Sequence, residues 1–568
     1  MATIASPSAH VPSATPPATR TQLVPDHPRH PKGARARVLL TSVFGPYAQD
    51  DEFGSRAMNP MELYHNQVTR VQGAFSLRMF HRSWGIQMIQ ANISAPCTVL
   101  DFPTRPAFLR ELRRHRYDVV GISSIVTNVW KVREMCRLVR EVSPGTTIVI
   151  GGHVTAVAGL ERTIDADHLV RGDGIEWMRR FLGDDPRAPI HHPSIVSGFG
   201  VRALGLRSPA TRGGTAATII TSVGCPLGCN FCTTSAFFGG KGKMLQFFDG
   251  ADEIFRVMSQ AESDLGVHSF FMMDENFLLF RPRAMRLLSL MQAHDKAWSL
   301  YVFSSANALA KYTMDELVQL GISWVWMGLE SPHSTYAKLK GADTRVLVAE
   351  LQAHGIRVLG STIIGLEHHT PDNIDDEIGH AVAHATDFHQ FMLYTPVPGT
   401  PLHAELDGAG KMLPVDLADI HGQWKFNFTH PAISRDESKT FLDRAFETDF
   451  ERNGPSLYRI CATTLRGWLR HRDHPDARVR RRLAQEADVL KMYVALVYAM
   501  ERRLTGDIRA RMRALRALAE RELGFQARVV SRLVGPILAW TAKREERRLA
   551  RGQTYEPPTI IERARWAQ

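Results

Sequence analysis

The segment 216–232 reads AATIITSVGCPLGCNFC and joins an apolar run to a group of cysteines. The β-branched residues of 216–223 predict a buried strand. Three of the six cysteines of the chain follow within a span of eight residues: Cys225, Cys229 and Cys232. Thiolates this close on one loop can converge on a soft metal centre, and Gly224 and Gly228 allow the loop to wrap closely. The segment therefore predicts a metal site at the carboxyl end of a strand.

Two kinds of site remain open on this spacing alone. An iron–sulfur cluster normally takes four thiolates, so three local ligands would leave one iron open to a substrate or cofactor. A zinc ion could instead be completed by a distant His or Cys, or the thiols could be incidental. The other cysteines, Cys97, Cys136 and Cys461, are isolated in the sequence.

Short apolar runs alternate with helical patterns after this loop. They lie at residues 268–273, 298–304, 323–327, 357–364 and 389–394. Strands that alternate with helices predict a parallel sheet, and six such units in residues 216–402 predict a partial (β/α)6, TIM-like barrel. Binding groups gather at the carboxyl ends of the strands in such folds, so the residues just after each run are candidate site residues.

A second series of apolar runs precedes the barrel. It lies at residues 37–43, 98–101, 118–123, 147–151 and 168–170, with a clear helix over 128–142. This pattern predicts an open, doubly wound (Rossmann-like) α/β domain over residues 35–190, followed by a linker at 191–215. Residues 1–34 hold seven prolines and almost no large apolar side chain, so we expect a disordered tail.

The composition narrows the class of protein. The chain has 568 residues, of which 44% are hydrophobic, and its six cysteines are too sparse for a disulfide framework. Reduced thiols favour the cytoplasm, and no run of about 18 apolar residues could span a membrane. We expect no nucleic-acid partner, because no aromatic platform or binding motif accompanies the basic residues.

The positive charge lies in the C-terminal region. Residues 462–568 hold 24 Lys and Arg against 12 Asp and Glu, while the rest of the chain is nearly neutral. Helical patterns dominate residues 403–568, which we expect to form a helical, basic C-terminal domain. Segment 525–550 has an apolar centre flanked by basic residues. We expect it to pack on the barrel, with peripheral contact to a membrane surface as the alternative.

The CxxxCxxC spacing resembles that of the radical S-adenosylmethionine (SAM) enzymes, and the resemblance covers residues 216 to about 402. It implies that the three cysteines ligate a 4Fe-4S cluster whose open iron is chelated by SAM. An electron from a donor such as flavodoxin or ferredoxin would cleave SAM to a 5'-deoxyadenosyl radical, which abstracts hydrogen from an unactivated C–H bond.

Other strand ends resemble the elements by which this family binds SAM. The implied SAM contacts are Phe231, Asp274, Glu275, Asn276, Gly328, Glu330, Ser331 and Gly365. Without the cysteines, the acidic residues would equally suit a helix cap or a salt-bridged rim. One departure concerns residues 365–370, which read GLEHHT where related enzymes often read GLPGET, so the adenine side is less well defined.

The N-terminal domain resembles a cobalamin-binding domain. Glycines at strand ends let a flat ring approach the backbone, although ordinary turns of a doubly wound sheet also use them. The candidate cobalamin contacts are Ser123, Ser124, Gly151, Gly152, His153, Gly172 and Gly174, with His65 and His81 as further possibilities. No DxHxxG motif occurs, which fits methylases that leave the lower cobalt face without a protein ligand, or a domain that has lost cobalamin.

These resemblances imply cobalamin-dependent methylation of an unactivated carbon in a small or lipid-like substrate. Radical cyclisation, rearrangement or carbon–carbon coupling is the alternative, and a non-catalytic cobalamin sensor is a more remote one. No catalytic side chain beyond the cofactor ligands can be assigned from the sequence. Segment 44–90 is unusually long between strands, so it is expected to cover a cofactor or substrate cavity.

Overall fold

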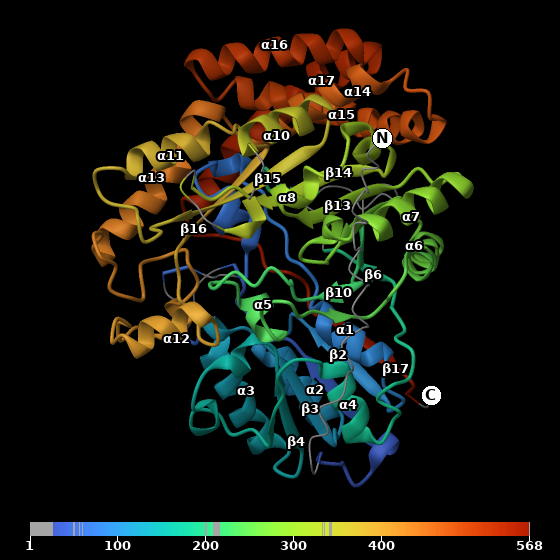
Figure 1. Cartoon of the computed structure of the whole chain (residues 1–568), viewed down its shortest axis with the longest axis vertical. Coiled ribbons are helices and arrows are strands. Elements are labelled where there is room, and N and C mark those ends of the chain that lie inside the picture. Colours follow the sequence, from blue (N-terminus) through green and yellow to red (C-terminus); the bar gives the residue numbers. More distant parts are fainter. Residues whose placement is uncertain are drawn as a thin grey trace, which may run out of the picture.

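The computed structural model describes residues 27–48, 52–55, 57–58, 61–198, 202–207, 216–331, 333, 336–339 and 343–566. Figure 1 shows a first α/β unit at one end of the molecule, a second sheet in the middle and a layer of long helices at the other end. The mixed α/β class with a helical C-terminal region is as predicted.

The first sheet has six strands in the order β17-β2-β1-β3-β4-β5. Helices α2 and α3 cover one face through Phe108 and Val132, and α1 and α4 cover the other through Ile86 and Phe181. Helices on both faces of a parallel sheet confirm the doubly wound fold. The elements are β1 (Val38–Thr41), α1 (Trp84–Ala91), β2 (Cys97–Asp101), α2 (Arg105–Arg114), β3 (Val119–Ser123), α3 (Val129–Val142), β4 (Thr147–Gly151), β5 (His168–Leu169) and α4 (Gly174–Leu182).

The second sheet contains the six predicted parallel strands, and each strand pairs with the next along the chain. They are β9 (Ala216–Ile219), β12 (Ser269–Met272), β13 (Ser299–Ser304), β14 (Ile322–Gly328), β15 (Arg357–Ile364) and β16 (Phe388–Leu393). The helices between them are α5 (Thr233–Phe237), α6 (Ala251–Leu265), α7 (Arg281–Ala293), α8 (Ala306–Leu309), α9 (Met314–Gln319), α10 (Thr344–Ala353) and α11 (Ile374–Val382).

Side chains of the barrel strands alternate between two environments. In β13 and β14, Leu300, Val302 and Val325 are fully buried against the surrounding helices. The alternate residues point to the inner face of the sheet and are only partly buried: Tyr301, Phe303, Trp324 and Trp326. Successive side chains of a strand point to opposite faces, so the accessible inner face is aromatic.

Of the helices described after α12 (Pro401–Gly408), the first lies beside α11, and the other four close the end of the barrel that lies away from the first sheet (Figure 1). Leu359 and Phe388 of the barrel pack in one core with Leu465 and Leu490 of these helices. They are α13 (Arg435–Asn453), α14 (Ser456–His471), α15 (Ala477–Glu501), α16 (Gly506–Glu522) and α17 (Gly524–Leu549). Within the described ranges, no helix is both long and apolar enough to cross a membrane.

The structure departs from the predicted organisation at three places. Residues 1–26 of the expected tail lie outside the described residues, whereas His30 donates its backbone N–H to Phe181 at 2.8 Å and so packs on α4. In the expected linker, β6 (Ile195–Val196) pairs antiparallel with β9, and the short strands β7 (Arg202–Ala203) and β8 (Leu206–Arg207) form a hairpin. After the helices, β17 (Ile560–Ala564) returns to the first sheet and pairs antiparallel with β2.

Candidate functional site

The cysteine loop is held between a small hairpin and a short helix. Strand β10 (Ser222–Val223) pairs with β11 (Leu245–Gln246), and α5 begins directly after Cys232. Gly224 and Gly228 have φ of +88° and +65°. A Cβ at Gly228 would stand 2.5 Å from the Lys241 side chain, so this turn requires glycine. The predicted close wrapping of the loop is present.

Internal hydrogen bonds tie the cysteine loop to α5. Cys232 caps α5, because its Sγ accepts the backbone N–H of Ser235 at 3.5 Å. The Ser235 hydroxyl donates to the Cys225 carbonyl at 2.8 Å, which ties the start of the loop to the helix. Burial raises the pKa of Cys225 to about 11 and also raises the pKa of Cys229. A bound metal would therefore have to supply the positive charge that keeps these groups as thiolates.

The spacing of the sulfurs fits a cluster better than a single ion. In a tetrahedral zinc site with 2.3 Å bonds, neighbouring sulfurs lie about 3.8 Å apart. Among the residues that the structure describes, one group of three His, Cys, Asp or Glu has its ligand atoms within 4.8 Å of one another. The three cysteines are not that group, so their sulfurs are not all this close together. A multi-iron cluster takes each thiolate on a different iron, so these residues fit a 4Fe-4S cluster with one open iron.

Asp274 is bound to other residues of the barrel. Its carboxylate accepts hydrogen bonds from the hydroxyls of Thr221 and Ser222 and forms an ion pair with Arg283 at 3.0 Å. Both members of the pair are almost fully buried. Asn276 is also engaged, since its amide donates to the Ser305 hydroxyl at 2.9 Å. These two predicted SAM contacts have internal partners.

Glu275 differs from its neighbours in this acidic segment. One of its carboxylate oxygens is buried and has no hydrogen-bond partner. Burial raises the pKa of Glu275 to about 8, and the negative charge of Asp274 adds to the shift. A buried carboxylate oxygen that lacks a partner is costly, so Glu275 suits a cationic ligand group beside the cysteine loop.

A buried ion pair follows β14. Glu330 is 3% exposed, has φ of +50° and pairs through one oxygen with Lys338, while its other oxygen has no partner. A Cβ at Gly328 would meet both members of this pair at 2.6–2.7 Å, so glycine makes room for it. Burial alone would lower the pKa of Lys338, but the charges of Glu330 and Cys229 raise it overall.

Lys338 also connects these residues to the cysteine loop. Its ammonium lies 5.2 Å from the centre of the Phe231 ring. The neighbouring Asn230 accepts a hydrogen bond from Tyr336 and donates one to Tyr394, each at 3.3 Å. Sequence reasoning missed Lys338 and Asn230. Asn230 stands inside the cysteine motif, whereas no pattern around Lys338 predicts its burial.

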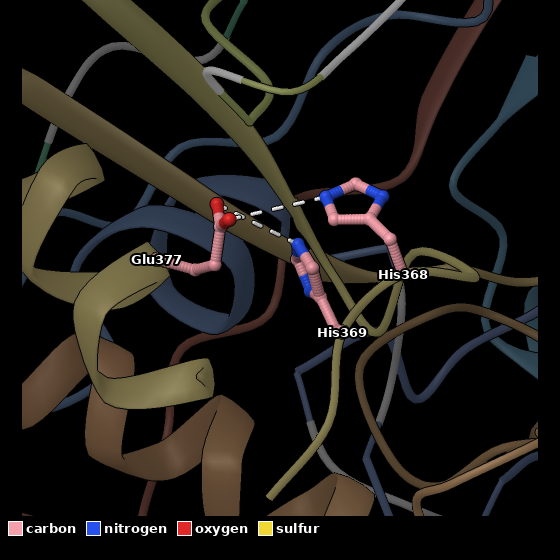
Figure 2. Close-up of side chains that lie close together, drawn as sticks. All are labelled: His368, His369 and Glu377. Carbon is pink, nitrogen blue, oxygen red and sulfur yellow. Dashed lines mark ion pairs between the residues drawn. The ribbon is translucent and has the colours of Figure 1, made fainter. Parts of the chain in front are cut away.

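Two histidines, His368 and His369, lie in the turn after β15 (Figure 2). Gly365 has φ of +81° and donates its backbone N–H to Nδ1 of His369 at 3.0 Å. Ser331, a predicted SAM contact, bonds Nε2 of His368 at 2.9 Å. A Cβ at Gly365 would stand 2.2 Å from Phe426. The sequence that departs from the family pattern thus still forms a tight, glycine-dependent turn.

His368, His369 and Glu377 also have the residue types of a metal site. The Glu377 carboxylate lies 3.7 Å from Nε2 of His369 and 3.9 Å from Nε2 of His368. However, Nδ1 of His369 accepts a hydrogen bond, so in the neutral ring Nε2 carries the proton and has no lone pair for a metal. Burial lowers the pKa of His369 to about 3, which keeps the ring neutral. The cluster therefore supports the turn.

The strand ends of the first sheet leave room for a ligand. A Cβ at Gly151 or Gly172 would meet nothing within 4 Å, so both positions face open space. Gly152 is different, because its φ is +83° and a Cβ there would stand 2.4 Å from the Ser124 carbonyl. Gly174 begins α4, and a Cβ there would lie 3.1 Å from Ile89. The open positions fit the approach of a flat ring, and the tight ones fix the turns beside it.

His153 lies where the two sheets meet. It begins the short helix His153–Ala156, and its ring centre is 4.7 Å from that of Phe237 at the end of α5. Burial lowers the pKa of His153. The other two histidines considered for cobalamin lie elsewhere: Nδ1 of His65 bonds Ser76, and His81 stacks on Phe271 of the barrel.

Comparisons with known proteins identify both units. Residues 73–182 match the family model described as B12 binding domain, and residues 219–380 match that of the Radical SAM superfamily. An uncharacterized methyltransferase of Pyrococcus horikoshii is 23% identical over 319 residues, which cover 50% of this chain and 68% of that protein. The bacteriochlorophyllide d C-12(1)-methyltransferase of Chlorobaculum tepidum is 26% identical over 309 residues, or 51% of this chain and 66% of that protein.

A solved structure is also similar. The radical SAM methyltransferase TsrM of Kitasatospora setae, with cobalamin and a [4Fe-4S] cluster bound, aligns with a TM-score of 0.48 and 15% identity. The alignment covers 81% of this chain and 99% of that one. Both domain models match in the order that the fold shows, so the chain contains a B12-binding domain followed by a radical SAM domain.

Proposed function

We propose that this chain is a cobalamin-dependent radical SAM methyltransferase that methylates an unactivated carbon of a small or lipid-like molecule. The observation that carries this proposal is the contact between His153 and Phe237. It brings the strand ends of the B12-binding domain against the helix that Cys232 caps. Two cofactors held by these two units would therefore share one reaction space.

The proposed roles of the polar residues follow from their unmet hydrogen bonds. Glu275 and Glu330 each have a buried carboxylate oxygen without a partner, and both lie next to the cysteine loop. We assign Glu275 to the amino group of SAM and Glu330 to a polar group such as its ribose. When bound, the cluster and SAM supply a radical that abstracts hydrogen, and cobalamin supplies the methyl group.

The inner face of the barrel supports an apolar substrate. The rings of Phe303 and Trp326 stack at 4.8 Å, and those of Trp324 and Phe388 stack at 5.2 Å. A polar track crosses this wall, because Trp326 donates to Ser361 at 2.7 Å and Ser361 donates to Gln390. Such a lining excludes water and fixes orientation through few polar groups.

Two further expectations belong to this proposal. The electron donor would be a small redox protein such as flavodoxin or ferredoxin, and the enzyme would work in the cytoplasm, where thiols stay reduced. The names of the curated relatives support methyl transfer, since both are methyltransferases and one acts on bacteriochlorophyllide d.

The test is anaerobic reconstitution with iron, sulfide and cobalamin, followed by an assay for 5'-deoxyadenosine and S-adenosylhomocysteine with reductant and methyl-labelled SAM. We expect both products, and the Cys229→Ala variant should lose them. Cys461→Ala is the matched control, because this thiol is buried among the C-terminal helices. Deoxyadenosine without S-adenosylhomocysteine would replace methyl transfer by cyclisation or coupling. Neither product from a loaded protein offered candidate substrates would favour a cobalamin sensor.

A further inference from the structure

The last long helix, α17, has its large apolar side chains on the outside. Its buried positions are small or polar, with Ala527, Ser531, Gly535 and Ala542 facing the protein. Its large apolar residues are mostly exposed: Phe525 (77%), Leu533 (67%), Ile537 (60%) and Trp540 (61%). This is the reverse of an ordinary surface helix, which buries its large apolar side chains.

The buried small residues let α17 approach its neighbouring helix closely. A Cβ at Gly535 would stand 2.6 Å from the Tyr498 ring of α15, so the two helices approach closely at this point. We expected segment 525–550 to pack on the barrel, but α17 packs chiefly on α15 and α16. It does so through these small residues together with Leu538, which joins the same core. The stability of the fold does not account for the four large residues on the other side.

These four residues share one face of the helix. Leu533, Ile537 and Trp540 are spaced by four and three residues, and Phe525 stands eight residues before Leu533. Spacings of three, four and eight return to the same side of a helix with 3.6 residues per turn. Scattered exposed apolar residues are normal on a surface, but a contiguous stripe marks an interaction site.

Basic side chains border the stripe. Arg532, Lys543, Arg544 and Arg547 are exposed, and within the part of the chain that the structure describes none of them forms an ion pair. The two acidic residues of the helix are neutralised elsewhere: Glu545 is buried against Arg548, and Glu546 pairs with Arg503. The outer face of α17 is therefore apolar in its centre and purely cationic at its border.

We propose that this face binds the surface of an anionic lipid membrane, with α17 lying in the plane of the interface. Aromatic and aliphatic side chains on one face with Lys and Arg beside them are the chemistry of interfacial helices. The cationic border favours anionic lipid headgroups, whereas a second copy of the same face would repel it. The helix lies at the end of the molecule opposite the first sheet, so docking leaves that sheet free (Figure 1).

Co-sedimentation of the full chain with vesicles tests this proposal, and the readout does not depend on methyl transfer. We expect binding to vesicles of equal parts phosphatidylglycerol and phosphatidylcholine, and much weaker binding to phosphatidylcholine alone. Replacing three basic residues (Arg532→Gln, Lys543→Gln and Arg544→Gln) should weaken partitioning about a hundredfold, at about fivefold per charge. The double variant Leu533→Ser with Trp540→Ser should weaken it at least about tenfold.

Val346→Ser is the matched control, because Val346 is 53% exposed on α10 of the barrel and lies outside the stripe. It should bind vesicles like the wild type. Circular dichroism would confirm that each variant is folded. The proposal is overturned if the wild type does not bind anionic vesicles. It is also overturned if the basic triple variant and the apolar double variant both bind them as the wild type does. If the wild type is a dimer and the apolar double variant is a monomer, the face binds a second copy of the chain instead.

Discussion

In the acidic segment after β12, the substitution Glu275→Gln should raise the free energy of unfolding of the apoprotein, although most substitutions of buried residues lower it. Burial raises the pKa of Glu275 to about 8 from an ordinary value of 4.5. The folded state therefore holds a proton that the unfolded state releases between these pH values. The free energy of unfolding must fall as the pH rises through this window. Glutamine has the same shape and does not titrate, so the free energy of unfolding of the variant should not fall in this pH window.

The size of the effect follows from the shift. One pKa unit corresponds to about 1.4 kcal/mol, so the variant should gain about 3 kcal/mol over the wild type near pH 7 and at most about 5 kcal/mol above pH 8. Near pH 4.5 the two proteins should be equally stable. The neighbouring Asp274 is the control, because Asp274→Asn breaks a buried pair with Arg283 and should cost about 3–5 kcal/mol at neutral pH.

Urea unfolding of the apoproteins at about pH 5 and about pH 8, followed by tryptophan fluorescence, measures both effects. A Glu275→Gln protein that is no more stable than the wild type at the higher pH would refute the reasoning, because the carboxyl would then be adequately solvated or paired. In the reconstituted protein the same substitution should weaken SAM binding. Unchanged SAM affinity would remove Glu275 from the proposed contact to the amino group.

Three further outcomes are expected. Cys229→Ala should abolish incorporation of a four-iron cluster, measured as iron and sulfide bound per chain; retention of the full cluster would contradict the ligand assignment. Lys338→Met should lower the free energy of unfolding by about 3–5 kcal/mol, because it leaves Glu330 buried without its partner. Adding Glu330→Gln to this variant should restore most of the urea concentration at which half of the protein is unfolded. Gly365→Ala should cost about 1–3 kcal/mol through its φ of +81° and its contact with Phe426, and Phe426→Leu should relieve only the steric part of that loss in the same unfolding experiment.

The barrel strands could be predicted because each is a short apolar run followed by a helical pattern. The same reasoning could not predict β17, since residues 560–564 read IIERA without the alternation of a strand and gain a partner from the free edge of β2. The short strand β6 was missed for the same reason, because its pairing with β9 lies across a segment that reads as a linker. Pairings between distant residues leave little trace in local patterns.

The candidate site divides along similar lines. The cysteines could be predicted from their spacing, and the glycine turns around them from the need for positive φ. The sequence could not tell Asp274 from Glu275, because adjacent side chains point in different directions and only the fold decides which one meets Arg283. Lys338 could not be predicted either, since the space for its side chain arises from Gly328, ten residues earlier.

The pairing of β17 with β2 has a consequence for the order in which the protein is made. During synthesis from the N-terminus, β2 emerges early, and its outer edge stays open until residues 560–564 leave the ribosome. An unpaired strand edge is a template for wrong pairing with other chains. The sheet of the B12-binding domain is therefore complete only after the barrel and the C-terminal helices have been made.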